Sequence, residues 1–297
     1  MEQIKRKEVQ TAIACLPLQW QKKIRGAKQF DGIEEIRLRI GKNISLLISG
    51  AEQEIPDTFV TRDVLAEIVM RAAEYSIYSF QDSIRQGFIT VKGGHRIGIC
   101  GTTACSGEEI LSFQHISSLN IRVAKEHLNV AEPIMGEILG YNTLIISRSG
   151  MGKTTLLRDI ARLASMQGIK TAVADERCEI CGCYLGEPQF TFGNSLDVMD
   201  NCPKHVAAIM QIKTMSPQLL IMDELTSEKD IAAIGACLYS GVTIIASIHG
   251  DSMEDLCRRP YLQGLLHTGF FEKTVEIQAS YGNRTYVVKN MGGKTDV

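Results

Sequence analysis

The N-terminal part of the chain alternates apolar and polar positions in ways that predict β-strands. In IEEIRLRIG, Ile36, Leu38 and Ile40 share one face and charged residues occupy the other, which is typical of a half-buried strand. ISLLISG and SLNIRVAKE predict two further strands. GFITVKGGHRIGICG predicts a hairpin that turns at Gly93 and Gly94, because paired glycines accept positive φ angles.

Helical spacing appears in the same region. One helix is predicted over Val9–Arg25, and Pro17 lies inside that span as a potential break, because proline lacks the N–H that a helix interior needs. TRDVLAEIVMRAAEY begins with a threonine that can cap a helix, and its apolar residues recur at helical spacing from Val64 to Ala72. Residues 1–125 therefore predict a small α+β domain.

The pattern changes from about residue 126. Short, continuously apolar strands (NTLIIS, KTAVA, LLIM and VTIIASI) alternate with helical segments such as TLLRDIARLASMQG. This alternation predicts a mostly parallel sheet buried on both faces, an α/β fold. We expect Glu126–Asn142 to be a linker with a lead-in helix, and residues 126–297 to form the second domain.

Composition limits the classes of function. The chain has 297 residues, 44% of them hydrophobic, and a net charge of −2, so electrostatics favour neither nucleic acid nor anionic lipid. The N-terminal stretch MEQIKRKEVQ lacks the apolar region of a signal peptide, and the apolar runs are too short to span a bilayer. Nine cysteines in such a chain suggest reduced thiols. We therefore expect a cytoplasmic protein with no direct membrane insertion and no nucleic-acid partner.

The stretch SRSGMGKTT, residues 147–155, contains most of the phosphate-binding pattern G-x-x-x-x-G-K-[ST], with Ser147 at the position of the first glycine. It follows a predicted strand and begins a predicted helix, so its backbone N–H groups can bind phosphate. Ser147 is expected to be tolerated at the strand exit. Lys153 would reach the β- and γ-phosphates of ATP, and the Thr154 hydroxyl would bind Mg²⁺. The expected nucleotide-binding residues are Ser149, Gly150, Met151, Gly152, Lys153, Thr154 and Thr155.

Acidic residues follow two of the predicted strands. LLIMDEL ends in Asp223, placed to hold the metal through water, and Glu224, placed to orient or activate the attacking water. TAVADERCEI carries Asp175, Glu176 and Glu179, a set that needs a nearby cation. Solvated charges at a strand end are the alternative for Asp223 and Glu224, whereas a Mg²⁺–nucleotide or, locally, Arg177 could supply the cation for the second set.

A histidine and two arginines complete the candidates. His249 ends the strand VTIIASI, where a γ-phosphate contact would lie, although a lone histidine is as often an ordinary surface or core residue. Arg96 and Arg122 point away from the apolar faces of their strands. They are either solvent-exposed or a phosphate clamp or arginine finger that reaches a neighbouring subunit.

Four motifs in fixed order, SRSGMGKTT, ADERCEI, LLIMDEL and SGVTIIASIHG, resemble the type II/type IV secretion ATPase family, which includes pilus motors. EEIRLRIGKNISLLISG, GGHRIGICG and LNIRV resemble the N-terminal segments of that family. The resemblance implies an Asp box with Asp175, Glu176 and Glu179, a Walker B glutamate at Glu224, a His-box histidine at His249 and phosphate-contacting arginines at Arg96 and Arg122. Thr226 departs from the family, which often has arginine there.

The resemblance also implies a function. A member of this family is a Mg²⁺-dependent ATPase with a RecA-like motor domain, expected to form a homo-hexameric ring whose sites are completed at subunit interfaces. Longer stretches spread over residues 34–250 resemble a sporulation branch of the family more closely. That branch implies a mother-cell ATPase, peripheral at the membrane through a protein partner, that works with membrane proteins of a secretion-like channel to the forespore.

Three alternatives stay open. A nucleic-acid-dependent RecA-like motor would need a basic, aromatic strip that the sequence lacks. A non-catalytic scaffold would use nucleotide only as an assembly switch. A zinc site in CEICGC would use Cys178, Cys181, Cys183 and Cys202, but only one C-x₂-C pair is present, so reduced structural thiols are favoured.

Overall fold

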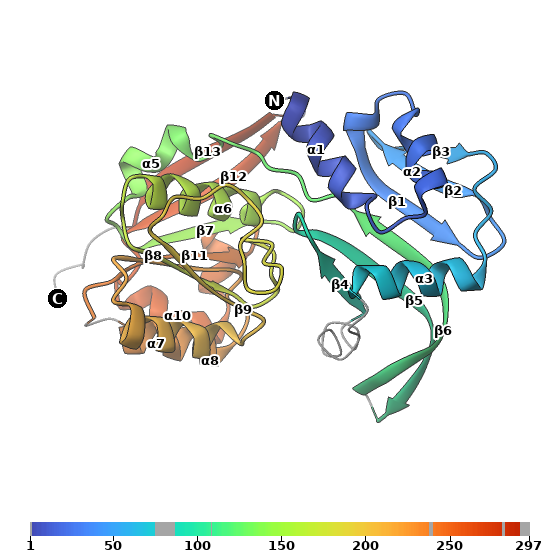
Figure 1. The fold of residues 1–297 in the computed structure, drawn as a ribbon. Helices are drawn as coiled ribbons and strands as arrows, with labels where there is room; N and C mark the ends of the chain where they lie inside the picture. The colour runs from blue at the N-terminus through green and yellow to red at the C-terminus, as the bar shows by residue number, and fades with distance from the viewer. Residues whose placement is uncertain (1, 75–86, 108, 238–239, 281–282, 292–297) are drawn as a thin grey trace. The chain divides into compact units, whose positions relative to one another are not determined.

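The computed structural model describes residues 2–74, 87–107, 109–237, 240–280 and 283–291. The chain forms two compact units (Figure 1). Unit 1 comprises Met1–Glu126 together with Gly182–Phe190, and unit 2 comprises His127–Cys181 together with Thr191–Val297. A short segment from the second half of the chain therefore belongs to the unit that the first half forms, and no local pattern predicts this.

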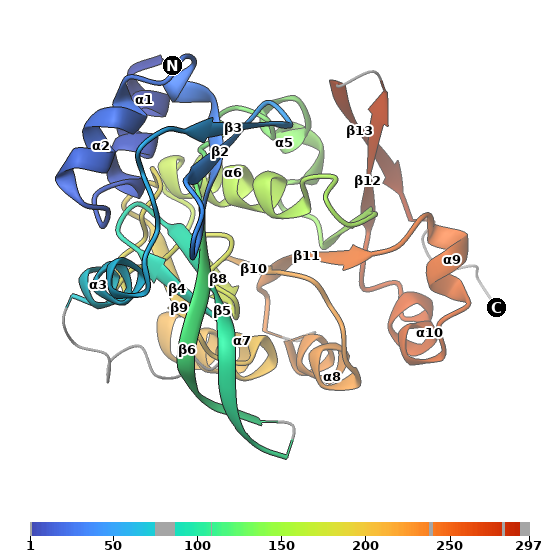
Figure 2. The same ribbon diagram turned by 90° about the vertical axis from the view of Figure 1, so that its right-hand side faces the viewer.

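Unit 1 is an antiparallel sheet with three α-helices and one 3₁₀ helix in its described part (Figure 2). The strands lie in the order β3-β2-β1-β6-β5-β4, and every neighbouring pair is antiparallel. The strands are β1 (Ile33–Arg39), β2 (Ile44–Ile48), β3 (Ala51–Ile55), β4 (Phe88–Val91), β5 (His95–Ser106) and β6 (Glu109–Arg122). The helices are α1 (Glu2–Ala12), α2 (Leu18–Arg25), η1 (Phe30–Gly32) and α3 (Arg62–Ala72).

A proline, a capping threonine and a pair of glycines in unit 1 lie where the sequence predicts a helix break, a helix start and a turn. The first predicted helix divides into α1 and α2, and Pro17 stands at the N-cap of α2. The side chain of Thr61 accepts the backbone N–H of Val64 and caps α3; Tyr75, at the end of that predicted segment, lies outside the described residues. Gly93 and Gly94 have φ angles of 90° and 74°, which is why this β4–β5 turn uses glycines.

Two strands of unit 1 differ from the prediction. β6 is much longer than the predicted segment SLNIRVAKE, because it continues with β5 into a largely exposed pair (Figure 1). β3 was not predicted. Four of its five residues are exposed at the sheet edge, so its sequence AEQEI has no apolar face.

His95 predicts a pH dependence of stability. Its ring is fully buried and Nδ1 accepts the Ala124 N–H at 3.0 Å, while burial lowers the pKa of His95 to about 4. Because the unfolded chain binds this proton near pH 6.5, stability is fully present above that pH and falls as the pH drops toward 4, by about 3 kcal/mol. Urea unfolding at several pH values measures this pH dependence for the wild type and for His95→Asn. The asparagine keeps a hydrogen-bond acceptor near the position of Nδ1. Equal pH slopes would contradict the account.

Unit 2 contains a seven-stranded sheet in the order β13-β12-β7-β11-β10-β8-β9. All neighbours are parallel except the antiparallel hairpin of β12 and β13. The strands are β7 (Thr143–Ser147), β8 (Thr171–Asp175), β9 (Leu196–Asp200), β10 (Leu219–Met222), β11 (Thr243–His249), β12 (Lys273–Ser280) and β13 (Asn283–Asn290). The helices are α5 (Glu132–Ile138), α6 (Lys153–Met166), α7 (Lys204–Met215), α8 (Glu228–Cys237), α9 (Met253–Cys257) and α10 (Pro260–His267).

Helices cover both faces of the central strands, with α5 and α6 on one side and α7, α8 and α10 on the other (Figure 1). The apolar strands are consequently buried on both faces. Ile145 and Ile146, adjacent residues whose side chains point to opposite faces of β7, are 0% and 1% exposed. This confirms the mostly parallel, doubly covered α/β sheet that the continuous apolar runs predict.

The segment before β7 is tied to α6 by a buried ion pair. The Asp159 carboxylate accepts the N–H groups of Asn129 and Ala131 at 3.2 and 2.8 Å and the Arg162 guanidinium at 2.6 Å. Arg162 also donates to the Asn129 side chain. The segment that leads into the sheet of unit 2 is therefore fixed to α6, the helix that follows the predicted phosphate loop.

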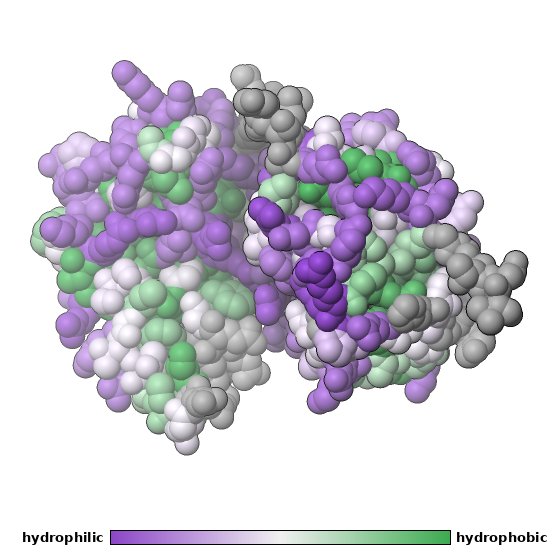
Figure 3. All heavy atoms as spheres, turned by 180° about the vertical axis from the view of Figure 1, so that it is seen from behind, coloured by the Kyte–Doolittle hydropathy of each residue, from purple (hydrophilic) through white to green (hydrophobic). Residues whose placement is uncertain are grey.

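No helix in the described part of the chain is both long and apolar enough to cross a bilayer. On the face seen in Figure 3, hydrophobic patches lie between hydrophilic side chains.

Candidate nucleotide-binding site

The predicted phosphate loop lies between β7 and α6. Gly150 and Gly152 have φ angles of 76° and 100°, and Gly152 is the N-cap residue of α6. These left-handed conformations curl the backbone so that the first N–H groups of α6 are available for an anion. Ser147 is not among the positive-φ residues in the described chain, so its position does not require glycine.

Lys153 is held by the loop itself. Its side chain is largely buried, and Nζ donates to the carbonyl oxygens of Ser147 and Arg148 at 2.9 and 3.3 Å. Burial lowers the pKa of Lys153, and the nearby carboxylates of Glu224 and Asp223 act in the opposite direction. The ammonium group is thereby fixed within the loop.

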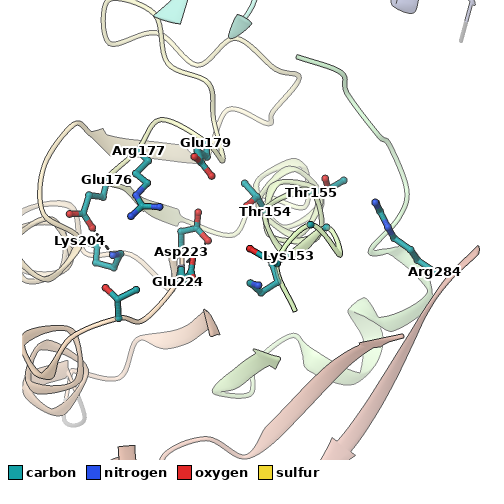
Figure 4. A pocket seen from close by; sticks show the side chains of 14 residues that line it. Lys153, Thr154, Thr155, Glu176, Arg177, Glu179, Lys204, Asp223, Glu224 and Arg284 are labelled. Carbon is teal, nitrogen blue, oxygen red and sulfur yellow. Dashed lines mark hydrogen bonds and ion pairs between the residues drawn. The ribbon is translucent and has the colours of Figure 1, made fainter. Parts of the chain in front are cut away.

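A pocket of about 390 Å³ opens above this loop (Figure 4). It brings together ten of the predicted site residues: Ser149, Gly150, Gly152, Lys153, Thr154, Thr155, Glu176, Glu179, Asp223 and Glu224. Four other residues complete its lining: Arg177, Lys204, Thr226 and Arg284. The predicted residues Met151, Asp175 and His249 do not line it.

Asp223 and Glu224 follow β10 directly and face the loop across the pocket (Figure 4). Oδ1 of Asp223 accepts the Glu224 N–H at 2.9 Å and the Ser247 hydroxyl at 3.2 Å. Burial raises the pKa of Asp223, and the carboxylates of Glu179 and Glu224 raise it further. A divalent cation would offset this crowding of negative charge, so the residues present fit a Mg²⁺-bound nucleotide.

Asp175 is turned away from the pocket. Its buried carboxylate accepts three backbone N–H groups, from Glu179, Ile180 and Cys181, at 2.8, 3.1 and 2.8 Å. Burial raises the pKa of Asp175 to about 6, against the lowering effect of these hydrogen bonds. The structure thus gives Asp175 an anchoring contact with the loop that carries Glu176 and Glu179, whereas the sequence grouped all three as site acids.

Replacement of Asp175 tests this anchoring contact. Asp175→Ala removes the carboxylate that accepts three backbone N–H groups, two of them buried, and we expect it to lower the free energy of unfolding by about 3 kcal/mol. Glu137→Ala, at an exposed position on α5, is the control and should change it by less than about 0.5 kcal/mol. Urea denaturation followed by circular dichroism measures both. Equal stabilities of Asp175→Ala and the wild type would contradict the anchoring role.

Two basic residues of the pocket, Lys204 and Arg284, were not predicted from the sequence. Lys204 Nζ lies 2.5 Å from Oε2 of Glu176, and its side chain is largely buried. It occupies the first turn of α7, where a helix dipole disfavours a cation. That unfavourable placement is a signal that could have identified it. Arg284 comes from β13, and no local motif marks it.

His249 lies beside the loop but outside the pocket lining. It ends β11 and is paired in register with Ser147. Its carbonyl oxygen accepts the Arg259 guanidinium at 2.7 Å. Two residues later, Asp251 accepts Arg148 Nε at 2.7 Å on the exposed side of the loop. A γ-phosphate contact by His249 stays a prediction.

Arg96 and Arg122 belong to unit 1, where they are paired in register on β5 and β6. The Arg96 guanidinium lies 4.5 Å from the centre of the Phe88 ring. Arg122 Nε lies 3.5 Å from Oε1 of Glu35, and its side chain is 68% exposed. Neither lines the pocket of unit 2, so their contact with phosphate also stays a prediction.

The cysteine-rich stretch does not form a zinc site in the described chain. Cys181 and Cys183 are buried, and Cys178 Sγ lies 3.5 Å from Oδ2 of Asp200. Within the described residues, no group of three or more histidine, cysteine, aspartate or glutamate side chains could hold a metal ion. The zinc alternative therefore gains no support.

The sheet order, the loop and the antiparallel N-terminal unit define a P-loop protein with a RecA-like secretion ATPase fold. The chain belongs to the family described as sporulation stage III, protein AA, which matches residues 5–290. It is 37% identical over 266 residues to stage III sporulation protein AA of Bacillus subtilis (strain 168), covering 87% of this chain and 86% of that protein. This confirms the resemblance to the sporulation branch, and the fold is the one that the resemblance to the secretion ATPases implies.

The fold is shared with solved structures of an ATPase and of a pilus retraction motor. The ATPase DotB of Yersinia pseudotuberculosis matches with a TM-score of 0.60 at 13% identity, over 93% of this chain and 80% of that one. The pilus retraction motor PilT, solved with bound ADP, matches with a TM-score of 0.58 at 10% identity, over 86% of this chain and 78% of that one. At such low identities these likenesses establish the fold and leave the activity to be argued from the site.

Proposed function

We propose that this protein is a Mg²⁺-dependent ATP hydrolase that energises or assembles a secretion-like channel during sporulation. The observation that carries the enzymatic part is the convergence in one pocket of the phosphate loop, Lys153 and the paired acids Asp223 and Glu224. These groups come from two different strand ends, β7 and β10, which are separated in the sheet by β11 alone. Chance residues at strand ends would not supply complementary charges in this arrangement.

Each group has a defined part in the proposed reaction. The N–H groups at the start of α6 bind the phosphates, and Lys153 donates to the β- and γ-phosphates. Thr154, and Asp223 through water, would hold Mg²⁺, which would neutralise charge on the phosphates. Glu224 orients the attacking water and accepts its proton. Glu176 and Glu179 border the γ-phosphate end, at positions fixed by the loop that Asp175 anchors.

The larger assembly is inferred from the family. We infer a homo-hexameric ring in which Arg96 and Arg122 of one subunit act on the nucleotide of its neighbour, since ring interfaces are head-to-tail. We place the protein on the cytoplasmic face of the mother-cell membrane, held there by membrane proteins of the channel. The membership in the sporulation family and the secretion ATPase fold support this placement.

Metal removal tests the enzymatic proposal. Wild-type protein should release phosphate from ATP in the presence of Mg²⁺. EDTA should reduce the rate to the level of buffer alone, and added Mg²⁺ should restore it, because the phosphates lose their charge-neutralising cation. Phosphate release that persists in EDTA would refute a Mg²⁺-dependent mechanism.

The partner proposal needs a separate experiment. Tagged wild-type protein and Lys153→Ala should be recovered from membranes of sporulating cells and compared for co-purifying membrane proteins. We expect specific membrane proteins with the wild type and reduced amounts with the variant. Recovery of the wild type without any membrane protein would count against a channel partner.

A further inference from the structure

Arg284 is a basic residue of the pocket to which the proposed function gives no role. It lies near the start of β13, in the C-terminal hairpin whose other strand, β12, pairs with β7. β7 leads directly into the phosphate loop, so the sheet carries Arg284 to the loop from a position about 130 residues later in the chain.

The guanidinium lies against the loop backbone. A Cβ atom placed on Gly152 would lie 2.8 Å from Nη1 of Arg284 and 3.0 Å from its Cζ. Gly152 thus serves two purposes: its φ of 100° suits glycine, and its lack of a side chain leaves room for the guanidinium. Arg284 also lines the same pocket as Ser149 and Thr155.

This placement is electrostatically unfavourable without an anion. The N-terminus of α6 carries the positive end of its helix dipole and free N–H groups, and Lys153 adds a full charge. Among the described residues, the Arg284 guanidinium makes no hydrogen bond or ion pair, and the pocket acids Asp223 and Glu224 lie on the far side of the loop (Figure 4). A phosphate bound at the loop would offset all of these positive charges at once, and a guanidinium binds phosphate through a fork of donors.

The side of the pocket on which Arg284 lies decides which phosphate of the nucleotide it would contact. Under the proposed function, on which this inference rests, Lys153 and Glu224 mark the γ-phosphate end. Arg284 lies across the loop from Glu224, and Thr155 is seen on the same side of α6 (Figure 4). We propose that Arg284 binds, within its own subunit, the α-phosphate side of the nucleotide, the part that ATP and ADP have in common.

Binding to the shared part of the nucleotide predicts a specific pattern of affinities. Isothermal titration with ADP and with a non-hydrolysable ATP analogue, both with Mg²⁺, should show a rise of Kd of about tenfold or more for Arg284→Ala. The factor should be the same for both nucleotides within about twofold. At saturating ATP the hydrolysis rate of Arg284→Ala should stay within about twofold of the wild type. A contact that is equally strong in the ground state and the transition state changes KM and leaves kcat unchanged.

Lys289→Ala is the matched control. Lys289 lies on the same strand, on the opposite face to Arg284, and pairs with Glu276 at 2.8 Å, so its replacement should leave both affinities unchanged. Unchanged affinities in Arg284→Ala would overturn the inference, and so would a loss confined to the ATP analogue, which would mean a γ-phosphate contact. If the wild type bound neither nucleotide, the proposed function itself would fail.

Discussion

Lys153→Ala should abolish measurable binding of ATP, raising its Kd by about 100-fold or more. The ammonium group is held within the loop by two backbone carbonyls and lies where the β- and γ-phosphates are proposed to bind. Loss of a charge-assisted hydrogen bond to a phosphate costs about 3 kcal/mol, and every 1.4 kcal/mol is a factor of ten. Titration of a fluorescent ATP analogue measures the effect.

The control for this prediction is a lysine in the same unit. Lys213→Ala removes an exposed charge in the last turn of α7 and should leave the affinity within about twofold of the wild type. Equal thermal unfolding midpoints of the three proteins would show that folding is intact. ATP affinity in Lys153→Ala that matches the wild type would mean that the nucleotide does not bind at this loop.

Glu224→Gln should keep nucleotide binding and lose turnover. The amide has the shape of the carboxylate but cannot accept a proton from water, and such a loss typically lowers kcat by about 100- to 10,000-fold. Removal of one of the crowded pocket carboxylates should leave ATP affinity equal or slightly tighter. A phosphate-release assay at saturating ATP, together with an equilibrium titration, separates the two effects.

Glu228→Gln is the control for Glu224→Gln. Glu228 is an exposed acid in the first turn of α8, close in sequence but outside the pocket lining, and its replacement should leave kcat unchanged. A scaffold that uses ATP only as an assembly switch would show no phosphate release even in the wild type, and that result would favour the non-catalytic alternative.

The strands of unit 2 were predictable where burial imposes a pattern. β7, β8, β10 and β11 are continuously apolar because helices cover both of their faces, and the loop follows the first of them. β12 and β13 carry mixed sequences, KTVEIQAS and NRTYVVKN, which no local rule assigned to the same sheet. The hairpin's pairing with β7 is a long-range choice that single-sequence periodicity does not encode.

The candidate site was predictable to a similar extent. Lys153, Asp223 and Glu224 are marked by short motifs whose chemistry requires them at strand ends, and the structure places them in one pocket. Asp175 carries an equally acidic signal, but its carboxylate turns inward because three backbone N–H groups need an acceptor there. Residue type predicts a charge at the strand end, whereas the direction of the side chain depends on the loop that follows.

A structure of Glu224→Gln determined with ATP and Mg²⁺ tests the central claim most directly. The account predicts a triphosphate in the pocket between the phosphate loop and β10, with its phosphates on the N–H groups at the start of α6 and with Lys153 in contact with the β- and γ-phosphates. A nucleotide bound elsewhere on the protein, or a triphosphate out of reach of Lys153, would contradict it.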